Sequence, residues 1–372
     1  MRICFLMLSH WTGNLGGAEI QVRYLMDYLR TNTNHEVSFV CRHSTATDGE
    51  GVAIHRTRPV PPLGRWFKAA DAVSVWGWLA RLRPDVIYTR VSSPYVGVAA
   101  AYCRRHGSRL VHHVARIEDV TPFRARRLRH WAKRLERPLY EYGLRRADAI
   151  IAQAEYQRRF LREHYGLEAA GVIPNFHPPP GETPAVARRR TIVWVANLKR
   201  DKRPELFVDL ARRCLDLEDA EFLMIGAVQD PAYARLTGDL VNVPNLRFLG
   251  PRPLEDVNRI LGLARLFVNT SRPSGEGFPN TFIQAWLRGT PTASLEVDPD
   301  GLISRHRIGV AAAGDMARLA DQVRELVRQP ELARELGQNA AAFARVTYSL
   351  DNCRRIVEVL EGRAQAQGRS VA

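Results

Sequence analysis

The chain alternates short apolar runs with longer stretches in which apolar residues recur every three or four positions. The first apolar run covers residues 2–8, and after a glycine-containing loop Ile20, Leu25 and Leu29 follow at helical spacing. A short apolar run bounded by turn residues predicts a strand, and the 3.6-residue spacing predicts a helix. The N-terminal segment is therefore predicted to form a strand, a loop and a helix.

This alternation continues to about residue 174. Further strands are predicted at 36–41, 85–89, 109–115, 148–153 and 171–174, and helices are predicted to end near Arg83 and to cover 94–105, 124–146 and 155–164. Short strands that alternate with helices are typical of a parallel sheet covered by helices on both faces.

A proline-rich segment then interrupts the pattern. The sequence PNFHPPPGETP, residues 174–184, holds five prolines and a glycine, which exclude both a helix and a paired strand. After this linker the alternation resumes, with strands predicted at 191–196, 221–226, 246–250, 266–270 and 290–295 and helices at 204–215, 254–263, 280–288 and the C-terminus. We therefore expect an α/β protein with two doubly wound parallel-sheet domains.

The expected domains are 1–176 and 191–348, joined by a linker over 177–190. The helical segment 349–372 has no strand behind it, and crossing back to the first domain is one interpretation. Because such sheets bind ligands at the carboxyl ends of their strands, the chemistry is expected in the cleft between the domains.

Composition agrees with a globular chain of this size. Of the 372 residues, 45% are hydrophobic and 25% charged, which excludes disordered, collagen-like and small disulfide-rich proteins. The five cysteines are scattered and never form a CxxC pair, so we expect free thiols and no zinc site on them. No apolar run approaches the length of about 18 residues that spans a bilayer, and 2–8 lacks a basic leader, so a soluble protein is expected.

The net charge of +15 is concentrated in one segment. Residues 124–146 hold nine basic and two acidic residues. Apolar side chains recur there at helical spacing, namely Leu128, Trp131, Leu135, Leu139 and Tyr142. One interpretation is an amphipathic helix with a solvated basic face, and the other, which we prefer, is attachment to an anionic membrane surface. Nucleic acid is disfavoured, because no aromatic stacking platform accompanies the charge.

Three further segments carry candidate chemistry, the first being the loop after the first strand. Gly16 and Gly17 stand where the first helix opens, and adjacent glycines let the backbone approach an anion such as a phosphate. A tight strand-to-helix turn is the alternative. The dinucleotide pattern GxGxxG is absent, which disfavours NAD.

The second segment, VANLKRDKRPELF over residues 195–207, places four cations after the first strand of the second domain. These cations are Lys199, Arg200, Lys202 and Arg203. A cationic loop before a helix can neutralise a diphosphate without a metal, and a solvated loop is the alternative.

The third segment is NTSRPSGEGFPNTFIQAWLRGTP, residues 269–291. It delivers Glu276 on a flexible loop just before a helix that begins near Asn280, and Gln284 lies on that helix. The free N–H groups of a helix start favour phosphate, and carboxylate and amide groups suit sugar or ribose hydroxyls.

The order and spacing of these pieces resemble one enzyme family. EGFPNTFIQAW with the following GTP, the upstream FLGP at 248–251, the lysine loop and the early GGAE are similar to the retaining nucleotide-sugar glycosyltransferases of family 4. The resemblance extends from Gly16 to about Gly301. It implies the GT-B fold, in which two tandem Rossmann-like domains face an interdomain cleft.

The resemblance also implies roles for individual residues. In the family the early glycines, here Gly16 and Gly17, approach the donor diphosphate. A lysine and an arginine of the second domain grip that diphosphate, and these positions hold Lys202 and Asn197. The asparagine departs from the family pattern, and Arg200 or Arg203 is the alternative source of the second cation.

The paired glutamates of the family fall on Glu276 and Gln284. The first is expected near the donor sugar and is assigned as catalytic, whereas the second, expected to hold the ribose, is replaced by an amide. We interpret this as a variant site, because an amide also bonds a ribose. The residues between them that are expected to contact the donor are Gly277, Phe278, Pro279 and Asn280.

A catalytic histidine often follows the fourth strand in this family. Here the strand contains His112 and His113, which strand alternation directs to opposite faces. The usual position falls nearer Ala115 or Arg116. We assign His113 to the donor sugar, with two alternatives: both histidines are structural, or Asp119 supplies the contact instead.

Together these features predict a retaining, metal-independent transferase that moves a hexose-type sugar from a nucleoside diphosphate, preferably UDP, to a hydroxyl of a glycan or lipid-linked acceptor. No cofactor is expected, and Asp298-Pro299-Asp300, although it spells DxD, is interpreted as a turn rather than a metal site. The expected location is the cytoplasm, with peripheral attachment to the inner membrane through 124–146. The rival hypothesis is a non-catalytic nucleotide-sugar-binding protein on the same scaffold.

Overall fold

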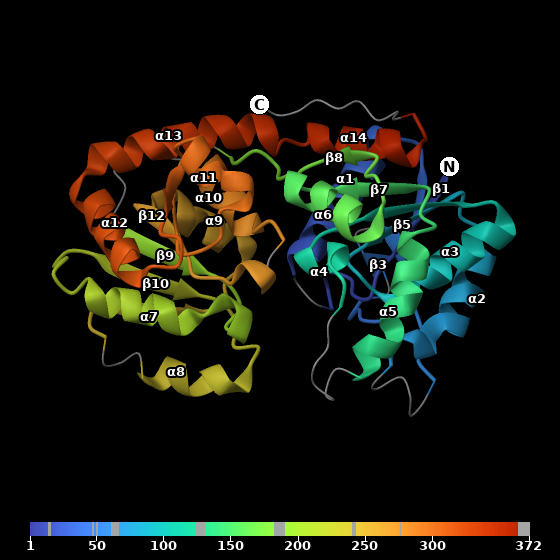
Figure 1. The fold of residues 1–372 in the computed structure, drawn as a ribbon, viewed down its shortest axis with the longest axis horizontal. Helices are drawn as coiled ribbons and strands as arrows, with labels where there is room; N and C mark the ends of the chain where they lie inside the picture. Colours follow the sequence, from blue (N-terminus) through green and yellow to red (C-terminus); the bar gives the residue numbers. More distant parts are fainter. Residues whose placement is uncertain are drawn as a thin grey trace. The chain divides into compact units, whose positions relative to one another are not determined.

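The chain divides into two compact units, each built around its own parallel sheet (Figure 1). The computed structural model describes residues 1–13, 16–46, 48–49, 51–60, 67–123, 131–181, 190–239, 243–275 and 277–363. The first unit comprises Met1–Phe176 together with the C-terminal segment from Leu350, and the second comprises His177–Ser349. Most of the predicted linker, 182–189, lies outside the described residues.

The first unit contains an eight-stranded sheet in the order β3-β4-β2-β1-β5-β6-β7-β8, in which β3 alone pairs antiparallel within the described residues. Its strands are β1 (Arg2–Leu6), β2 (Glu36–Cys41), β3 (Asp48–Gly49), β4 (Val52–Arg56), β5 (Val86–Arg90), β6 (Arg109–His113), β7 (Ala149–Ala152) and β8 (Gly171–Val172). Its helices are α1 (Gly17–Asn32), η2 (Lys68–Asp71), α2 (Ala72–Leu82), α3 (Pro94–His106), α4 (Ile117–Val120), α5 (Trp131–Leu144), α6 (Glu155–Tyr165) and α14 (Asp351–Leu360).

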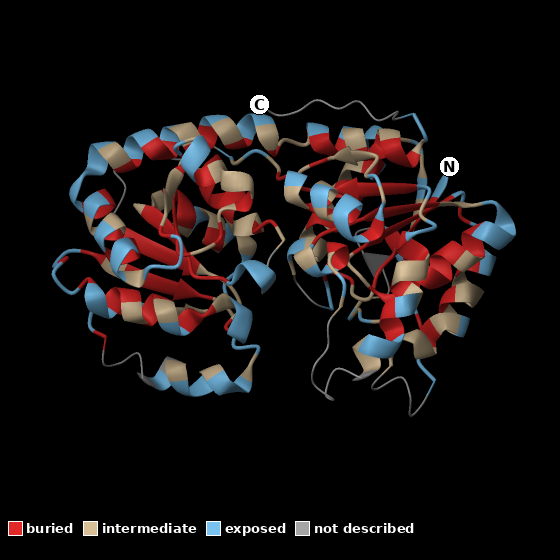
Figure 2. Ribbon diagram, viewed as in Figure 1, coloured by how far each residue is buried: buried red, intermediate tan, exposed pale blue. Residues whose placement is uncertain are grey.

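The alternation of side chains along β1 fills two cores, one on each face of this sheet. Ile3 and Phe5 pack with α1 and α14, whereas Cys4 and Leu6 pack with α2, α3 and α5. The final helix α14 contributes Cys353 to the same core as α1, which explains why it belongs to the first unit. Figure 2 shows the result as buried strands beneath helices whose outer faces are exposed.

The second unit contains a six-stranded parallel sheet in the order β11-β10-β9-β12-β13-β14. Its strands are β9 (Thr191–Val195), β10 (Glu221–Ile225), β11 (Leu246–Gly250), β12 (Leu266–Asn269), β13 (Thr292–Ser294) and β14 (Gly309–Ala311). Its helices are η4 (Arg200–Lys202), α7 (Pro204–Arg213), η5 (Pro231–Tyr233), α8 (Ala234–Asp239), α9 (Leu254–Leu263), η7 (Pro273–Gly275), α10 (Asn280–Leu287), η8 (Pro299–Gly301), α11 (Leu302–Arg305), α12 (Met316–Arg328) and α13 (Pro330–Thr347).

The predicted fold class, two doubly wound parallel-sheet domains, is confirmed. The sequence pattern missed β3, β4 and β14, and it extended the strand at 109–115 two residues beyond its observed end at His113. The basic helix is observed as α5, while 124–130 lie outside the described residues. In the described part of the chain no helix is long and apolar enough to cross a membrane. All five cysteines are buried free thiols.

Candidate functional site

The strand order of the second unit identifies where a ligand would bind. From β9 the chain adds β10 and β11 on one side, and it then returns to place β12 on the other side. Doubly wound sheets bind ligands at the carboxyl ends of the two strands where the order reverses. The loops after β9 and β12 therefore define the candidate site of this unit, and these loops carry the predicted residues.

Hydrogen bonds of Thr270 connect these two loops. Its side chain is buried, and its hydroxyl accepts a hydrogen bond from Nε1 of Trp194 at 2.9 Å and donates to the carbonyl oxygen of Lys202 at 2.8 Å. Nearby, the backbone N–H of Arg272 donates to the carbonyl of Asp201 at 2.9 Å. The cationic turn η4 is thereby held against the loop that leads towards α10.

Arg203 strengthens the same connection from an unusual backbone position. Its φ of 48° lies in the left-handed region, and its guanidinium is buried. Nε donates to the carbonyl of Thr270 at 2.6 Å, Nη2 donates to that of Ser271 at 2.9 Å, and Nη1 pairs with Glu296 at 3.0 Å. Arg203 therefore positions the loop after β12, which leaves exposed Arg200 as the alternative second cation.

The other predicted residues of the β9 loop occupy different environments. Lys202 is half-buried at the end of η4, close to the β12 loop. Asn197 accepts a long hydrogen bond, 3.4 Å, from the backbone N–H of Ala227, so its side chain reaches towards the loop after β10. The structure therefore places Lys202 beside the β12 loop and directs Asn197 to the neighbouring strand.

Aromatic packing fixes the start of α10. Phe278 is buried, with ring centroids 5.1 Å from Tyr348 and 5.9 Å from Trp286. Pro279 caps the helix, whose first residue is Asn280, and half-buried Gly277 precedes the phenylalanine. This anchoring sets the direction in which the first turn of α10 presents its backbone N–H groups.

Gln284 lies on α10 with 4% of its surface exposed. Its carbonyl oxygen accepts a hydrogen bond from Arg288, but its side-chain amide makes none with any residue that the structure describes. The buried side-chain atoms that lack a partner in the described chain do not include this amide, so it is accessible and can bond a polar ligand. Glu276, the predicted catalytic glutamate, lies outside the described residues.

The DxD sequence is a turn, as predicted. The carboxylate of Asp298 accepts from the N–H of Ile303 at 2.8 Å and from the hydroxyl of Ser304 at 3.0 Å, so it caps the short helix α11. The described residues include no group of three or more His, Cys, Asp or Glu that could hold a metal ion.

In the first unit the strand order reverses between β1 and β5, so the loops after these strands are the corresponding candidate site. Gly16 caps α1 and Gly17 is its first residue. A Cβ at Gly16 would lie 2.5 Å from Oε2 of Glu19, and the backbone N–H groups of Gly16 and Glu19 lower the pKa of that carboxyl. The chain's own carboxylate thus occupies the helix start where a phosphate was expected.

Opposing effects act on the pKa of Glu19. Burial raises the pKa of this carboxyl, while its hydrogen bonds and the nearby charges of Arg116 and Arg90 oppose that rise. A carboxylate and two arginines therefore gather at the carboxyl end of the first sheet.

The two histidines of β6 face opposite sides of the sheet, as predicted. His112 is bonded at both ring nitrogens, to the hydroxyl of Thr89 at 2.9 Å and to that of Tyr140 at 3.3 Å, and burial lowers its pKa to about 4. It is a satisfied core residue. His113 is also fully buried, and burial lowers its pKa well below the ordinary value, but its Nε2 has no partner among the described residues.

Asp119, the alternative polar contact to the donor sugar, binds backbone N–H groups instead. Its carboxylate accepts hydrogen bonds from the N–H groups of Ser92, Ala115 and Arg116 at 2.8–2.9 Å. It therefore fixes the loop after β6 rather than offering itself to a ligand.

Arg90 is a residue that the sequence analysis missed. It ends β5 directly opposite His113, with 3% of its surface exposed. Nη2 donates to Asn175 at 2.6 Å and to Gln153 at 3.3 Å, and no ion pair joins it to a described carboxylate. A buried guanidinium without such an ion pair, beside a reversal of strand order, suits an anionic ligand group. The sequence signal that could have identified Arg90 is a cation at the end of the apolar run DVIYTR, residues 85–90.

Comparisons with known proteins agree with this fold. Residues 15–179 match the family model described as Glycosyltransferase Family 4, and residues 189–329 match the model described as Glycosyl transferases group 1. No curated protein matches the sequence.

Solved structures share the fold at low identity. Sucrose-phosphate synthase from Thermosynechococcus elongatus is 16% identical with a TM-score of 0.76, over 97% of this chain and 99% of that one. WaaG, a glycosyltransferase involved in lipopolysaccharide biosynthesis, is 13% identical with a TM-score of 0.76, over 97% and 100%. A point mutant of S. aureus TarM, solved with fondaparinux, alpha-GlcNAc-glycerol and UDP, is 16% identical with a TM-score of 0.64, over 78% and 58%. The chain therefore belongs to the family 4 glycosyltransferases of the GT-B fold.

Proposed function

We propose that this glycosyltransferase is a retaining, metal-independent enzyme that transfers a hexose-type sugar from a UDP-sugar to a hydroxyl of a glycan or lipid-linked acceptor. The observation that carries the proposal is the joining of the β9 and β12 loops through Thr270 at the reversal of strand order. This joint brings Lys202 beside the segment that leads to Glu276 and α10.

On the donor side, Lys202 and the first N–H groups of α10 would bind the diphosphate. Gln284, whose side-chain amide makes no hydrogen bond within the described chain, would bond the ribose hydroxyls. Negative charge that develops on the departing diphosphate would meet these groups already in place, which is why no metal is required in the proposal. Glu276 would contact the donor sugar.

The first unit would supply the acceptor surface, with His113 in contact with the donor sugar and the backbone at Gly16 and Gly17 close to the donor diphosphate. Nδ1 of His113 accepts hydrogen bonds, so the ring proton is on Nε2, where it can be donated to a sugar hydroxyl. Retention and the UDP preference come from the family resemblance. In support, the similar TarM mutant was solved with UDP.

Thermal unfolding with a panel of nucleotides and nucleotide sugars, with and without a chelator, tests this proposal. A ligand at ~100 times its dissociation constant raises the stability of the folded state by about 2.7 kcal/mol. We expect a chelator-insensitive rise with UDP or one UDP-sugar. The rise should be lost in Lys202→Ala and retained in Arg318→Ala, a control at an exposed cation of α12. A protein that no nucleotide stabilises would contradict the proposal.

Turnover separates an enzyme from a nucleotide-sugar-binding protein. With the stabilising UDP-sugar as donor, release of UDP in the presence of a hydroxyl acceptor should be detectable, and Glu276→Ala should abolish it while UDP still stabilises the variant. Binding without turnover on any acceptor would favour the non-catalytic alternative.

The proposal includes location in the cytoplasm with peripheral attachment to an anionic membrane through the basic segment 124–146. In support, Arg134 of α5 and Arg145 and Arg146 directly after it are exposed, and the apolar residue Leu135 of α5 is 61% exposed. Co-sedimentation with anionic vesicles at low salt tests this part.

A further inference from the structure

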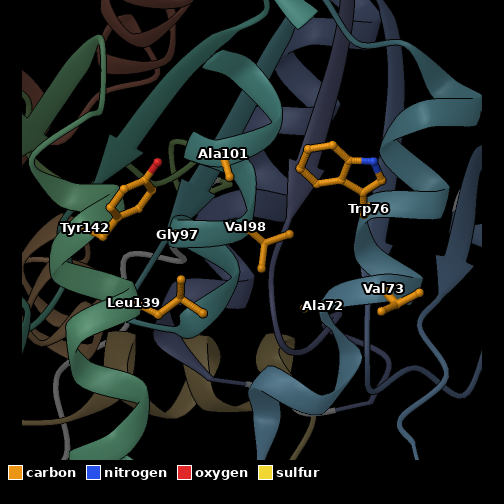
Figure 3. Close-up of a pocket in the computed structure, with 8 residues that line it drawn as sticks. All are labelled: Ala72, Val73, Trp76, Gly97, Val98, Ala101, Leu139 and Tyr142. Carbon is orange, nitrogen blue, oxygen red and sulfur yellow. The ribbon is translucent and has the colours of Figure 1, made fainter. Parts of the chain in front are cut away.

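An apolar groove opens in the first unit between α2, α3 and α5 (Figure 3). Its volume of about 570 Å³ lies within the range of small-molecule sites. The lining residues are Ala72, Val73, Trp76, Gly97, Val98, Ala101, Leu139 and Tyr142, none of which is charged. The groove lies on the helical layer that covers one face of the sheet, and it includes none of the residues assigned above to glycosyl transfer.

Two glycines let α3 and α5 approach closely beside the groove, and one of them, Gly97, lines it. A Cβ at Gly97 would lie 2.2 Å from the carbonyl oxygen of Leu139, and one at Gly143 would lie 2.4 Å from the carbonyl carbon of Val96. The backbones of α3 and α5 therefore touch at their crossing. Figure 3 shows Leu139 and Tyr142 projecting from α5 and Trp76 from α2, on either side of Val98.

The apolar surface continues outside the groove. Val73, which lines it, is 81% exposed, and Leu135, one helical turn before Leu139, is 61% exposed. Large apolar side chains that are exposed in this way are typical of a surface that binds another apolar molecule or a membrane.

The charge around the groove is positive. Segments 68–82, 94–106 and 131–146, which form the helical layer, carry nine Lys and Arg residues and three acidic ones. The basic residues are Lys68, Arg81, Arg104, Arg105, Lys133, Arg134, Arg137, Arg145 and Arg146, of which Arg137 is buried and bonded within the unit. An anionic partner therefore complements this surface.

Each of the three acidic residues has a hydrogen-bond or ion-pair partner within the unit. Asp71 accepts hydrogen bonds from Thr57 and Tyr95 in the core. Glu136 accepts from the backbone N–H groups at the start of η2, and Glu141 pairs with Arg137 at 2.8 Å. Lys133 pairs with Glu118 of α4, but the arginines at the end of α3 are exposed. The cations consequently outnumber the acidic groups that could screen them.

We infer that this groove binds one acyl chain of an anionic phospholipid in a bilayer, while the surrounding cations contact the headgroups. The inference rests on the proposed membrane attachment and names the site that would perform it. Burial of the exposed apolar surface supplies affinity, and the positive charge selects anionic lipid at about 1 kcal/mol per basic residue near the surface. A peptide or a second copy of the chain would need a complementary acidic face, and the described residues of this layer offer none to a second copy.

Quenching of Trp76 by brominated lipid tests the acyl-chain site directly. The full chain is mixed with vesicles of phosphatidylglycerol and phosphatidylcholine, in which the phosphatidylglycerol carries either brominated or ordinary chains. We expect bromine to quench the fluorescence, and most of that quenching to be missing in Trp76→Phe. Vesicles of phosphatidylcholine alone should give neither quenching nor sedimentation.

A matched pair of substitutions measures the contribution of the groove. Val73→Asp should weaken binding to anionic vesicles about tenfold, since burial of one valine side chain is worth about that factor. Val346→Asp is the control, because Val346 is 83% exposed on α13 of the second unit and should leave binding unchanged. Stabilisation by UDP should be the same in both variants, which separates this inference from the donor-site proposal.

Three outcomes would overturn the inference. Sedimentation with anionic vesicles without bromine quenching of Trp76 would mean that the surface adsorbs by charge alone, and membrane attachment would stand without the groove. Absence of sedimentation would contradict both the lipid-binding groove and the membrane attachment. A concentration-dependent dimer that Val73→Asp dissociates would show that a second copy covers the groove.

Discussion

Nη1 of Arg90 lies 3.1 Å from Nδ1 of His113 at the paired ends of β5 and β6. The hydroxyl of Tyr88 approaches the same nitrogen at 2.8 Å. Because the guanidinium can only donate, Nδ1 is the acceptor and the imidazole proton is on Nε2. Burial first, and then the charge of Arg90, hold the pKa of His113 well below its ordinary value. The histidine is therefore neutral with its N–H oriented by the arginine.

Substitution of Arg90 should destabilise the first unit. Arg90→Met would leave Gln153 and Asn175 buried without their donor, at a cost of about 3 kcal/mol in the free energy of unfolding. The control is Arg104→Met at an exposed position of α3, which should stay within about 0.5 kcal/mol. Denaturant unfolding followed by fluorescence measures both. Equal stability of the two variants would contradict the role assigned to Arg90.

Four buried histidines should make stability fall in mild acid. Burial lowers the pKa of His10, His112 and His177 to about 4 and holds that of His113 well below its ordinary value, whereas an unfolded histidine has a pKa of about 6.5. Below pH 6.5 the unfolded state therefore binds protons that the native state does not, so the free energy of unfolding decreases as pH falls from 6.5 towards 4. Each histidine contributes at most about 1.4 kcal/mol per pH unit.

Unfolding measured at several pH values checks this slope. His177→Gln should reduce it by the contribution of one proton, because this buried side chain is then unable to titrate in either state. A free energy of unfolding that is constant between pH 6.5 and 5 would show that the histidines are solvated in the native state.

At Arg203, alanine should be a worse replacement than glycine. Both substitutions remove the hydrogen bonds to Thr270 and Ser271 and the pair with Glu296. Only glycine adopts the left-handed φ of 48° without strain, so Arg203→Gly should be more stable than Arg203→Ala by about 1 kcal/mol. Thermal unfolding of the two variants decides this, and the opposite order would contradict it. Both should also bind UDP more weakly, because the β12 loop loses its support.

Gly16 and Glu19 should be energetically coupled. Gly16→Ala places a methyl group 2.5 Å from Oε2 of Glu19 and so displaces the carboxylate from the start of α1, at a cost of about 1 kcal/mol. In a Glu19→Ala background the same substitution has nothing to displace and should cost less. A double-mutant cycle measured by thermal unfolding should give a coupling of at least about 0.5 kcal/mol. Simple additivity would mean that the contact carries no energy.

Gln284 should affect nucleotide binding more than folding. Gln284→Leu removes an amide that makes no hydrogen bond within the described chain, so unliganded stability should be unchanged or slightly higher. The dissociation constant for UDP should rise about tenfold, as expected for the loss of hydrogen bonds to the ribose. Calorimetric titration compares the variant with the original protein. An unchanged affinity would place the ribose elsewhere.

Local periodicity in the sequence was sufficient to predict most of the fold. Buried strands such as 36–41 and helices such as 254–263 occur where the apolar pattern predicts them, because a strand or helix that must bury one face repeats that face within a few residues. The two residues of β3 and the three of β14 are too few to show a period, and β4 carries polar residues near the edge of its sheet. These three strands pair with neighbouring strands, which a local pattern does not show.

The residues of the candidate site also divide into those that the sequence identified and those that only the structure identified. The sequence by itself determined the family, through the motif around Gln284, and the cationic loop that contains Lys202. The tertiary structure alone decided that Arg203 is bonded to the loop after β12 and that Arg90 lies against His113. The physical reason is distance along the chain: these contacts join residues 67 and 23 positions apart, and no local pattern specifies which distant oxygen or nitrogen a guanidinium will meet once the strands are aligned.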